Sequence, residues 1–357
     1  MSDDPLNMNL NQSYSVEVQH NAQDKMAGWN DLSKDHVLYR FGGELKAILD
    51  EAAHDEMYGV KLVASEEGST PPHTTLIILQ KFLRANAGDL PKAKTQLLEA
   101  LKWRKSYNPL AAKDELFSKD KFGGLGYVTK VKGAKHGAQE GANEADVVTF
   151  NIYGAAAKDP KKAFGDTDAF VRWRVALMEL TLSHLNLNNS TSEIPDYGQG
   201  PDTHQAVQVH DYLSVSFFRQ PAEIKASSSK IIDLFQRYYP ETVSYKYFVN
   251  VPLVMQWMMG AMKALMSKDS IQKMTWMTYG NTLSQYLGTD VPKEYGGSGP
   301  ALEDSASTVK YDEAAATPSA TTTTEPTATA ETPAQPQAEP VPEVAPAAAE
   351  TAEPAKA

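Results

Sequence analysis

The stretch VQVHDYLSVSFFR, residues 207–219, alternates in side-chain character with a period of two. This period is typical of a β-strand, in which successive side chains point to opposite faces of the sheet. His210 and Tyr212 therefore fall on one face of the predicted strand, and Asp211 falls on the other. Imidazole and phenol groups can both bind a metal, so two candidate ligands are expected side by side.

The two segments that follow suggest a ligand pocket. Residues 245–252 (YKYFVNVP) are rich in aromatic and β-branched residues and predict a second strand. Residues 253–266 are dominated by Met, Leu, Trp and Ala and predict a long apolar helix, whose methionines give it a deformable surface. The strands and the helix are expected to form the floor and the lid of a pocket. The alternative is that this helix is simply buried in the core.

Strands and helices alternate from residue 122 to residue 290, which predicts an α/β domain with a mainly parallel sheet. The remaining elements are predicted as strands over 122–131 and 147–153 and as helices over 168–185 and 225–238. Either Asp166 or Asp168 is available as the N-cap of the helix over 168–185, since aspartate is a typical N-cap residue.

A small helical module is expected before this domain. An apolar face with helical periodicity predicts a helix over 75–86, and Pro91 suits the first turn of the next helix. A weaker helix over 36–53 is expected to be interrupted by Gly42 and Gly43.

Composition divides the chain into four parts. The N-terminal residues are polar and lack periodicity, and residues 317–357 are mainly Pro, Ala, Thr and Glu, which cannot bury enough apolar surface to offset chain entropy. The predicted organisation is a disordered N-terminus (1–30), a helical module (36–112), an α/β ligand-binding domain (113–300) and a disordered tail (301–357).

Composition also excludes several classes of protein. The chain contains no cysteine, so it has neither a disulfide framework nor a thiolate metal site. Its formal net charge of −11 argues against non-specific binding of nucleic acid, which requires a basic surface. The N-terminus lacks the regions of a signal peptide, and the longest apolar run, 249–266, is broken by polar residues. We therefore expect a soluble, cytoplasmic protein.

Further segments carry a family resemblance. They are LQKFLRAN (79–86), ALKWRKSYNPL (100–110), YYPETVSYKYFVNVP (238–252) and VPKEYGG (291–297). In this order and spacing they resemble the CRAL-TRIO lipid-transfer superfamily, over residues 36–297. Within it, TFNIYG (149–154), FVRWRVALME (170–179), QVHDYLSVSFFR (208–219) and KYFVNVP (246–252) resemble one fungal branch, the phosphatidylinositol transfer proteins that also bind haem.

The resemblance implies a fold, ligands and site residues. The fold would be the CRAL-TRIO lipid-binding fold, an α/β fold in which helices and a mainly parallel sheet enclose a ligand cavity. Haem b would be bound through Tyr212 as the axial ligand of the iron, with His210 beside it and with Arg174 and Lys246 as nearby basic residues. The protein would transfer phosphatidylinositol between membranes without catalysing a reaction. It would associate peripherally with endoplasmic reticulum (microsomal) membranes and serve phosphoinositide homeostasis or the response to oxidants.

Tyr212 is the sharpest candidate for an iron ligand. A neutral phenol is a poor ligand, because its pKa is about 10. Ferric iron and a nearby cation, supplied by Arg174 or Lys246, favour the phenolate, and tyrosinate is an established haem ligand. Two alternatives stay open: Tyr212 is a core residue, or His210 is the ligand, since imidazole is the commoner haem partner. His210 could also do no more than hydrogen-bond Tyr212 or a backbone carbonyl.

The sequence departs from the family at two positions. Asn86 stands where the branch carries a tyrosine, so a contact from the helical module to the haem is not implied by the resemblance. Tyr245 stands where other phosphatidylinositol-binding members carry a lysine, so recognition of the inositol headgroup by the usual residues is not implied. Two alternatives to the carrier function stay open. One is a haem sensor or store without lipid transfer, and the other is a peroxidase-like enzyme, for which the sequence shows no distal histidine–arginine pair.

Overall fold

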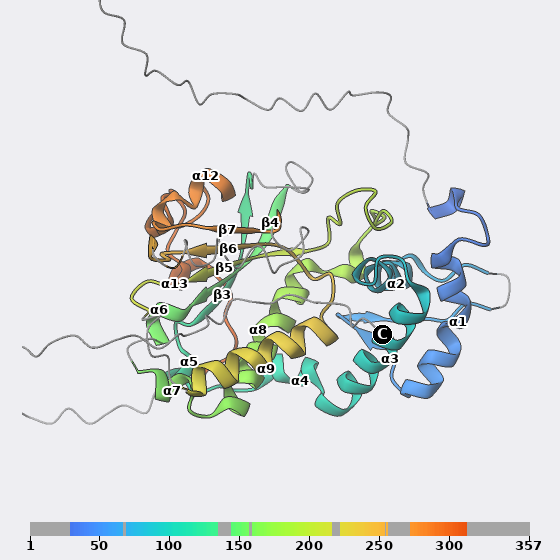
Figure 1. Cartoon of the computed structure of the whole chain (residues 1–357), viewed down its shortest axis with the longest axis horizontal. Coiled ribbons are helices and arrows are strands. Elements are labelled where there is room, and N and C mark those ends of the chain that lie inside the picture. Colours follow the sequence, from blue (N-terminus) through green and yellow to red (C-terminus); the bar gives the residue numbers. More distant parts are fainter. Residues whose placement is uncertain are drawn as a thin grey trace, which may run out of the picture.

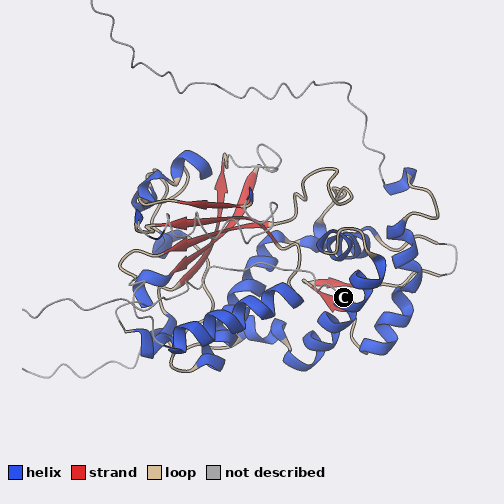
Figure 2. Cartoon of the chain, in the orientation of Figure 1, coloured by secondary structure: helices blue, strands red, loops and turns tan. Residues whose placement is uncertain are grey.

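The computed structural model of the chain describes residues 29–66, 69–134, 144–156, 159–215, 222–253, 255 and 272–312. Of the segments expected to be disordered, 1–30 and 301–357, residues 1–28 and 313–357 lie outside the described residues, as does most of the apolar helix expected over 253–266. Disorder at residues 29 and 30 is wrong, because both belong to a 3-10 helix in which Trp29 is buried. The described part forms a sheet covered by helices, with a helical module beside it (Figures 1 and 2). None of its helices is both long enough and apolar enough to cross a membrane.

A five-stranded sheet with the order β3-β4-β5-β6-β7 forms the centre of the larger domain. Its strands are β3 (Gly126–Lys132), β4 (Ala145–Ile152), β5 (Ala206–Asp211), β6 (Val243–Val249) and β7 (Met274–Trp276). β3 is antiparallel to β4, whereas β4, β5, β6 and β7 are parallel to one another. The predicted α/β fold with a mainly parallel sheet is confirmed. The loops that follow β4 to β7 consequently meet at one edge of the sheet.

β5 is shorter than its alternating pattern predicts. The alternation predicts a strand as far as Arg219, whereas β5 ends at Asp211. Oδ1 of Asp211 accepts a hydrogen bond from the backbone N–H of Leu213 (2.8 Å), which turns the chain, and Ser214 then has a left-handed φ of 67°. Tyr212 therefore lies one residue past the strand, at the carboxyl edge of the sheet.

Two long helices, α8 (Thr167–Leu185) and α9 (Ala222–Tyr238), lie on one side of the sheet (Figure 1). Asp166 caps α8 by accepting a hydrogen bond from the backbone N–H of Ala169 (3.0 Å), as the sequence predicts. The short helices before and between these elements are α4 (Pro109–Asp114), α5 (Lys119–Phe122), α6 (Tyr153–Ala156), α7 (Pro160–Phe164) and a 3-10 helix (Leu187–Asn189). An apolar layer covers the other face, with side chains from α12 (Ser284–Leu287), α13 (Leu302–Ser305) and the 3-10 helix Lys293–Tyr295. A further 3-10 helix, Gly280–Thr282, precedes α12.

The described residues of the helical module form three α-helices, one 3-10 helix and a small hairpin. Its elements are a 3-10 helix (Trp29–Asp31), α1 (Val37–Ala52), β1 (Glu56–Met57), β2 (Val60–Lys61), α2 (His73–Ala85) and α3 (Leu90–Tyr107). The interruption expected at Gly42 and Gly43 is wrong, because α1 runs through both residues. Close packing explains the first glycine: a Cβ on Gly42 would lie 2.7 Å from Cγ of Pro71.

The module and the sheet domain share a hydrophobic core. Buried side chains of α1, α2 and α3 belong to the same cluster as those of α8 and α9. At the junction the ring of Trp103 stacks on that of Tyr238, with 4.6 Å between the ring centroids. Neither unit therefore buries its apolar surface alone.

The chain after residue 300 continues to pack on the sheet domain. Ser307 exchanges two backbone hydrogen bonds with Val128 of β3, each 2.8 Å long. Val309 is buried, and the hydroxyl of Tyr311 donates to the carbonyl of Phe122 (3.0 Å). The folded part extends past the boundary expected at residue 300, because these apolar side chains stand singly among polar ones and give no periodic signal.

Candidate functional site

The face of the sheet that is directed toward α8 carries buried polar side chains. Asn151 of β4 and Gln208 and His210 of β5 lie on this face and are 1%, 5% and 9% exposed. The alternate position, Val209, packs in the apolar layer on the opposite face. Buried polar groups require partners, so this polar wall is a candidate ligand-binding surface.

Two basic residues reach the polar wall from different elements. The guanidinium of Arg174, on α8, donates a hydrogen bond to Oδ1 of Asn151. Lys246 of β6 is half-buried and pairs with Gln208 across the parallel strands. The positive charges of Arg174 and Lys246 both act on His210, so the structure brings these three predicted site residues together.

His210 is enclosed by partners within the polar wall. Its Nδ1 lies 3.3 Å from the hydroxyl of Tyr153, and its Nε2 lies 3.2 Å from Oε1 of Gln208. Its ring stacks on that of Phe248, with 5.0 Å between centroids. Burial lowers the pKa of His210 well below its usual value, and the two basic residues of the wall lower it further. The imidazole is therefore neutral at pH 7.

The stability of the fold should depend on His210 in acid. The unfolded chain binds a proton at this residue near pH 6.5, whereas the folded chain, with its lowered pKa, does not. The stability that His210 contributes is therefore present above about pH 6.5 and is lost as the pH falls toward the folded-state pKa. Between about pH 6 and pH 5, we expect the wild type to lose up to about 1.4 kcal/mol per pH unit more than His210→Gln. Urea unfolding of both proteins measures this difference, and equal pH slopes would contradict it.

Tyr212 lies at the carboxyl edge of the polar wall. Its backbone N–H donates to the carbonyl of Val249 (3.0 Å), and its half-buried ring lies 5.4 Å from the ring of Tyr153. Burial raises the pKa of the Tyr212 phenol above its usual value, the neighbouring phenol of Tyr153 raises it further, and Arg174 opposes the shift. The phenol is therefore neutral in this environment, and a metal cation at its oxygen would be needed to make it a phenolate.

The chemistry of these side chains fits a ferric porphyrin. Tyr212 offers an oxygen ligand, whereas both ring nitrogens of His210 already have partners in the wall. Beside Tyr212 and His210, the rings of Phe248 and Trp276 stack on each other with 3.9 Å between their centroids. They offer a flat apolar surface. The two basic residues suit carboxylates such as porphyrin propionates. Within the described residues, no group of three or more His, Cys, Asp or Glu side chains could hold a metal ion by itself.

A cavity of about 220 Å³ is lined by the end of α9, the start of β6 and the start of β7. Lys246 and Lys273 line it together with Glu241, and Gln208 connects it to the polar wall. Two ammonium groups and one carboxylate suit an anionic ligand that also carries hydroxyl groups. Lys273 and Glu241 are not among the site residues that the sequence pattern predicts.

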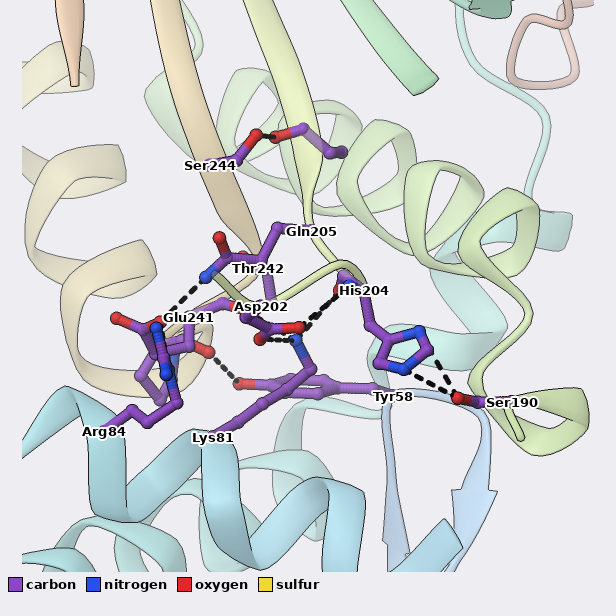
Figure 3. A network of polar contacts seen from close by, with 12 residues as sticks. Tyr58, Lys81, Arg84, Ser190, Asp202, His204, Gln205, Glu241, Thr242 and Ser244 are labelled. Carbon is purple, nitrogen blue, oxygen red and sulfur yellow. Dashed lines mark hydrogen bonds and ion pairs between the residues drawn. The ribbon is translucent and has the colours of Figure 1, made fainter. Parts of the chain in front are cut away.

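Side chains from α2 hold Glu241 at the cavity (Figure 3). The ammonium of Lys81 donates to the backbone carbonyls of Glu241 (2.9 Å) and His204 (2.8 Å) and to Oδ2 of Asp202 (2.6 Å). The side chains of Lys81 and Asp202 are fully buried. The carboxylate of Glu241 accepts a hydrogen bond from Nε2 of Gln205 (2.7 Å). This network maintains Glu241 in a left-handed backbone conformation, with φ of 52°.

A second buried network reaches the cavity through Tyr239. Its hydroxyl donates to Oε1 of Glu179 on α8 (2.6 Å), and Glu179 binds the guanidinium of Arg104 on α3 (2.7 Å). Arg104 also binds Glu56 of the hairpin (2.8 Å). The floor of the cavity is thus connected by charged hydrogen bonds to the helical module.

The two positions that depart from the family lie away from the polar wall. Asn86 ends α2, and its side chain makes hydrogen bonds within the module. Tyr245 packs against the apolar layer on the opposite face of the sheet, and its hydroxyl lies 2.7 Å from Oγ1 of Thr275. Tyr245 is also among the residues that line the cavity, and the lysines of that lining are Lys246 and Lys273.

Three further residues, which were not among the candidates predicted from the sequence, complete the wall: Gln208, Phe248 and Tyr153. Gln208 and Phe248 occupy alternate positions of their strands, so the period of two contains a signal for both. Tyr153 follows β4, and only the parallel register of β4 on β5 brings it to His210. Pattern alone does not predict that register.

The fold and the buried polar wall are typical of a ligand-binding α/β domain. Comparisons with known proteins agree with this class. A family profile described as "CRAL/TRIO domain" matches residues 147–297. A solved structure titled "Crystal structure of Sfh5" is 30% identical, with a TM-score of 0.61, and the match covers 76% of this chain and 90% of that chain.

Curated fungal relatives place the chain more narrowly. "Phosphatidylinositol transfer protein SFH5" of Phaeosphaeria nodorum is 50% identical over 275 residues, which are 77% of this chain and 80% of the relative. The protein of the same name from Cryptococcus neoformans var. neoformans is 44% identical, and the match covers 77% of this chain and 90% of the relative. The match to the Botryotinia fuckeliana protein, 47% identical, covers 79% of this chain and 62% of the relative. The chain belongs to the CRAL-TRIO family, in the fungal SFH5 group of proteins named as phosphatidylinositol transfer proteins, as the resemblance predicts.

Proposed function

We propose that this chain is a carrier that takes phosphatidylinositol from one membrane and delivers it to another. The observation that carries the proposal is the presence of two lysines and one glutamate in the lining of one cavity, in a chain whose relatives are named as phosphatidylinositol transfer proteins. In this proposal the phosphate of the headgroup lies between Lys246 and Lys273, and Glu241 accepts hydrogen bonds from inositol hydroxyls. The carrier contacts membranes transiently, including those of the endoplasmic reticulum.

Substitution of Lys273 tests the headgroup site. Lys273→Ala removes one charge-assisted hydrogen bond to the phosphate, so we expect transfer of phosphatidylinositol to fall about tenfold. The measurement follows labelled phosphatidylinositol from donor to acceptor vesicles of phosphatidylcholine. Lys225→Ala removes an exposed lysine of α9 that does not line the cavity and is the matched control. Equal rates for the two variants would remove Lys273 from the site, and absence of transfer by the wild type would overturn the carrier function.

Haem b is the second proposed ligand, at the carboxyl edge of the polar wall. The proposal is supported by the position of Tyr212 and His210 beside Arg174 and Lys246. When bound, ferric haem would supply an iron centre that a tyrosinate can ligate. Tyr212 would hold the iron, the two basic residues would pair with the propionates, and His210 would remain a neighbour with its present hydrogen bonds.

The proposed role of the haem is not catalytic. A peroxidase-type reaction requires an acid–base group beside the iron that can accept and return a proton. His210 has both ring nitrogens engaged, and its lowered pKa keeps it neutral. A lipid carrier that can also bind haem, serving phosphoinositide homeostasis or the response to oxidants, fits these groups better than an enzyme does. A haem store or sensor without lipid transfer is the outcome if vesicle transfer is absent while haem is bound.

A further inference from the structure

Asp211 connects the loops at the carboxyl edge of the sheet. Its side chain is 6% exposed and lies on the opposite face from His210. Its Oδ1 accepts hydrogen bonds from the backbone N–H of Leu213 and from Nδ2 of Asn250, both 2.8 Å long. Its Oδ2 accepts a third hydrogen bond, from the hydroxyl of Tyr295 (2.8 Å). One carboxylate therefore binds the loop after β5, the loop after β6 and the chain near residue 295.

Asn250 extends these hydrogen bonds to the loop after β7. Its Oδ1 accepts from the backbone N–H of Gly280 (2.8 Å), and its own backbone has a left-handed φ of 59°. Asparagine is among the side chains that tolerate this conformation best. A Cβ on Gly280 would lie 2.7 Å from Nδ2 of Asn250, so this close contact requires glycine. We name Asp211, Asn250 and Gly280 the edge clamp, since they join the ends of three neighbouring parallel strands.

Hydrogen bonds fix the backbone on both sides of Tyr212, and the edge clamp makes one of them. The N–H of Tyr212 donates to the carbonyl of Val249 (3.0 Å), and the next N–H, of Leu213, donates to Asp211 (2.8 Å). The carbonyl of Tyr212 accepts a hydrogen bond from Val215 (2.9 Å). Because peptide groups are planar, fixing both of them sets φ and ψ of the residue between them and the direction of its side chain.

We propose that Asp211 and Asn250 are positioning residues that orient the Tyr212 phenol toward its iron. This inference rests on the proposed haem function of Tyr212. Partners that orient a metal ligand typically change metal affinity 10–100-fold when they are lost.

The chemistry of Asp211 supports such a role. A buried carboxylate is costly unless its lone pairs are satisfied, and none of the ion pairs among the described residues includes Asp211. The carboxylate is retained where three donors from separate segments converge on it. An asparagine has one acceptor oxygen instead of two, so it could not accept from all three donors.

Asn250→Gly is the sharpest test, because glycine keeps the left-handed backbone and removes only the side chain. We expect haemin titration to show about 10–100-fold weaker binding, and the ferric tyrosinate charge-transfer absorption to shift or weaken. In the protein without haem, amide hydrogen exchange at Gly280 should become faster, because its acceptor is lost. Asn108→Gly makes the same substitution at a left-handed φ of 51° at the end of α3 and should change none of these quantities.

Asp211→Asn, measured with the same three methods, decides the case if Asn250→Gly does not fold. The positioning role is overturned if the clamp variants have the same haem affinity and spectrum as Asn108→Gly while Tyr212→Phe loses both. The proposed haem site would remain valid in that case. A Tyr212→Phe protein with wild-type affinity and spectrum would instead overturn the proposed haem function, and the role of the clamp toward iron with it.

Discussion

Tyr212→Phe is expected to fold as the wild type does and to lose its haem. The substitution removes one oxygen and leaves the packing of the ring, so the free energy of unfolding should change by only about 1 kcal/mol. The iron, in contrast, loses its protein ligand, so haem affinity should fall by more than the roughly 10–100-fold typical of an indirect partner. Haemin titration and the absorption spectrum of the purified protein measure both effects. The tyrosinate-to-iron charge-transfer absorption should disappear.

His210→Ala is the control that separates the two candidate ligands. The ring nitrogens of His210 are occupied by Tyr153 and Gln208, so its removal should weaken haem binding less than Tyr212→Phe does. A hard anionic oxygen also favours ferric over ferrous iron, so the wild-type haem should resist ordinary reductants. The opposite result would show that His210 is the iron ligand. In that case Tyr212→Phe keeps its haem and its spectrum, and His210→Ala loses both.

Residues within regular elements could be predicted from the sequence. The period of two places Gln208 and His210 on one face of β5, and the structure has both on the polar wall. The aspartate before the helix over 168–185 predicts an N-cap, and Asp166 caps α8. Period and capping are properties of neighbouring residues, so a pattern is sufficient to detect them.

The residues that depend on distant partners could not be predicted in this way. Glu241 lies in the turn before β6, and its left-handed backbone is held by Lys81, which is 160 residues away in the sequence. Lys273 reaches the cavity because β7 pairs with β6 in parallel, a register that its short apolar pattern does not specify. The alternating pattern extends past the end of β5 for a related reason: the side chain of Asp211 competes with the strand for the N–H of Leu213.

Lys81→Met is expected to destabilise the fold by about 3–5 kcal/mol, the usual cost of removing one partner from a buried ion pair. Lys81 and Asp202 are both fully buried, so the substitution leaves a carboxylate without a counter-charge in the core. It also leaves the carbonyls of His204 and Glu241 without their donor. Urea unfolding measures the loss. Lys102→Met is the matched control, because Lys102 pairs with Glu51 at the surface, where an ion pair contributes about 0–1 kcal/mol.

The double variant Lys81→Met/Asp202→Asn separates charge from geometry. Asparagine keeps an oxygen that can accept the His204 N–H, which lies 2.8 Å from Oδ1 of Asp202 in the wild type, and removes the negative charge that Lys81 balances. We therefore expect it to recover at least half of the lost stability, and a double variant as unstable as Lys81→Met would assign the cost to the two carbonyls instead. Glu241 lacks its Lys81 hydrogen bond in both variants. We therefore expect the double variant to transfer phosphatidylinositol slowly even though it recovers stability, because Glu241 at the cavity is no longer held in its left-handed turn.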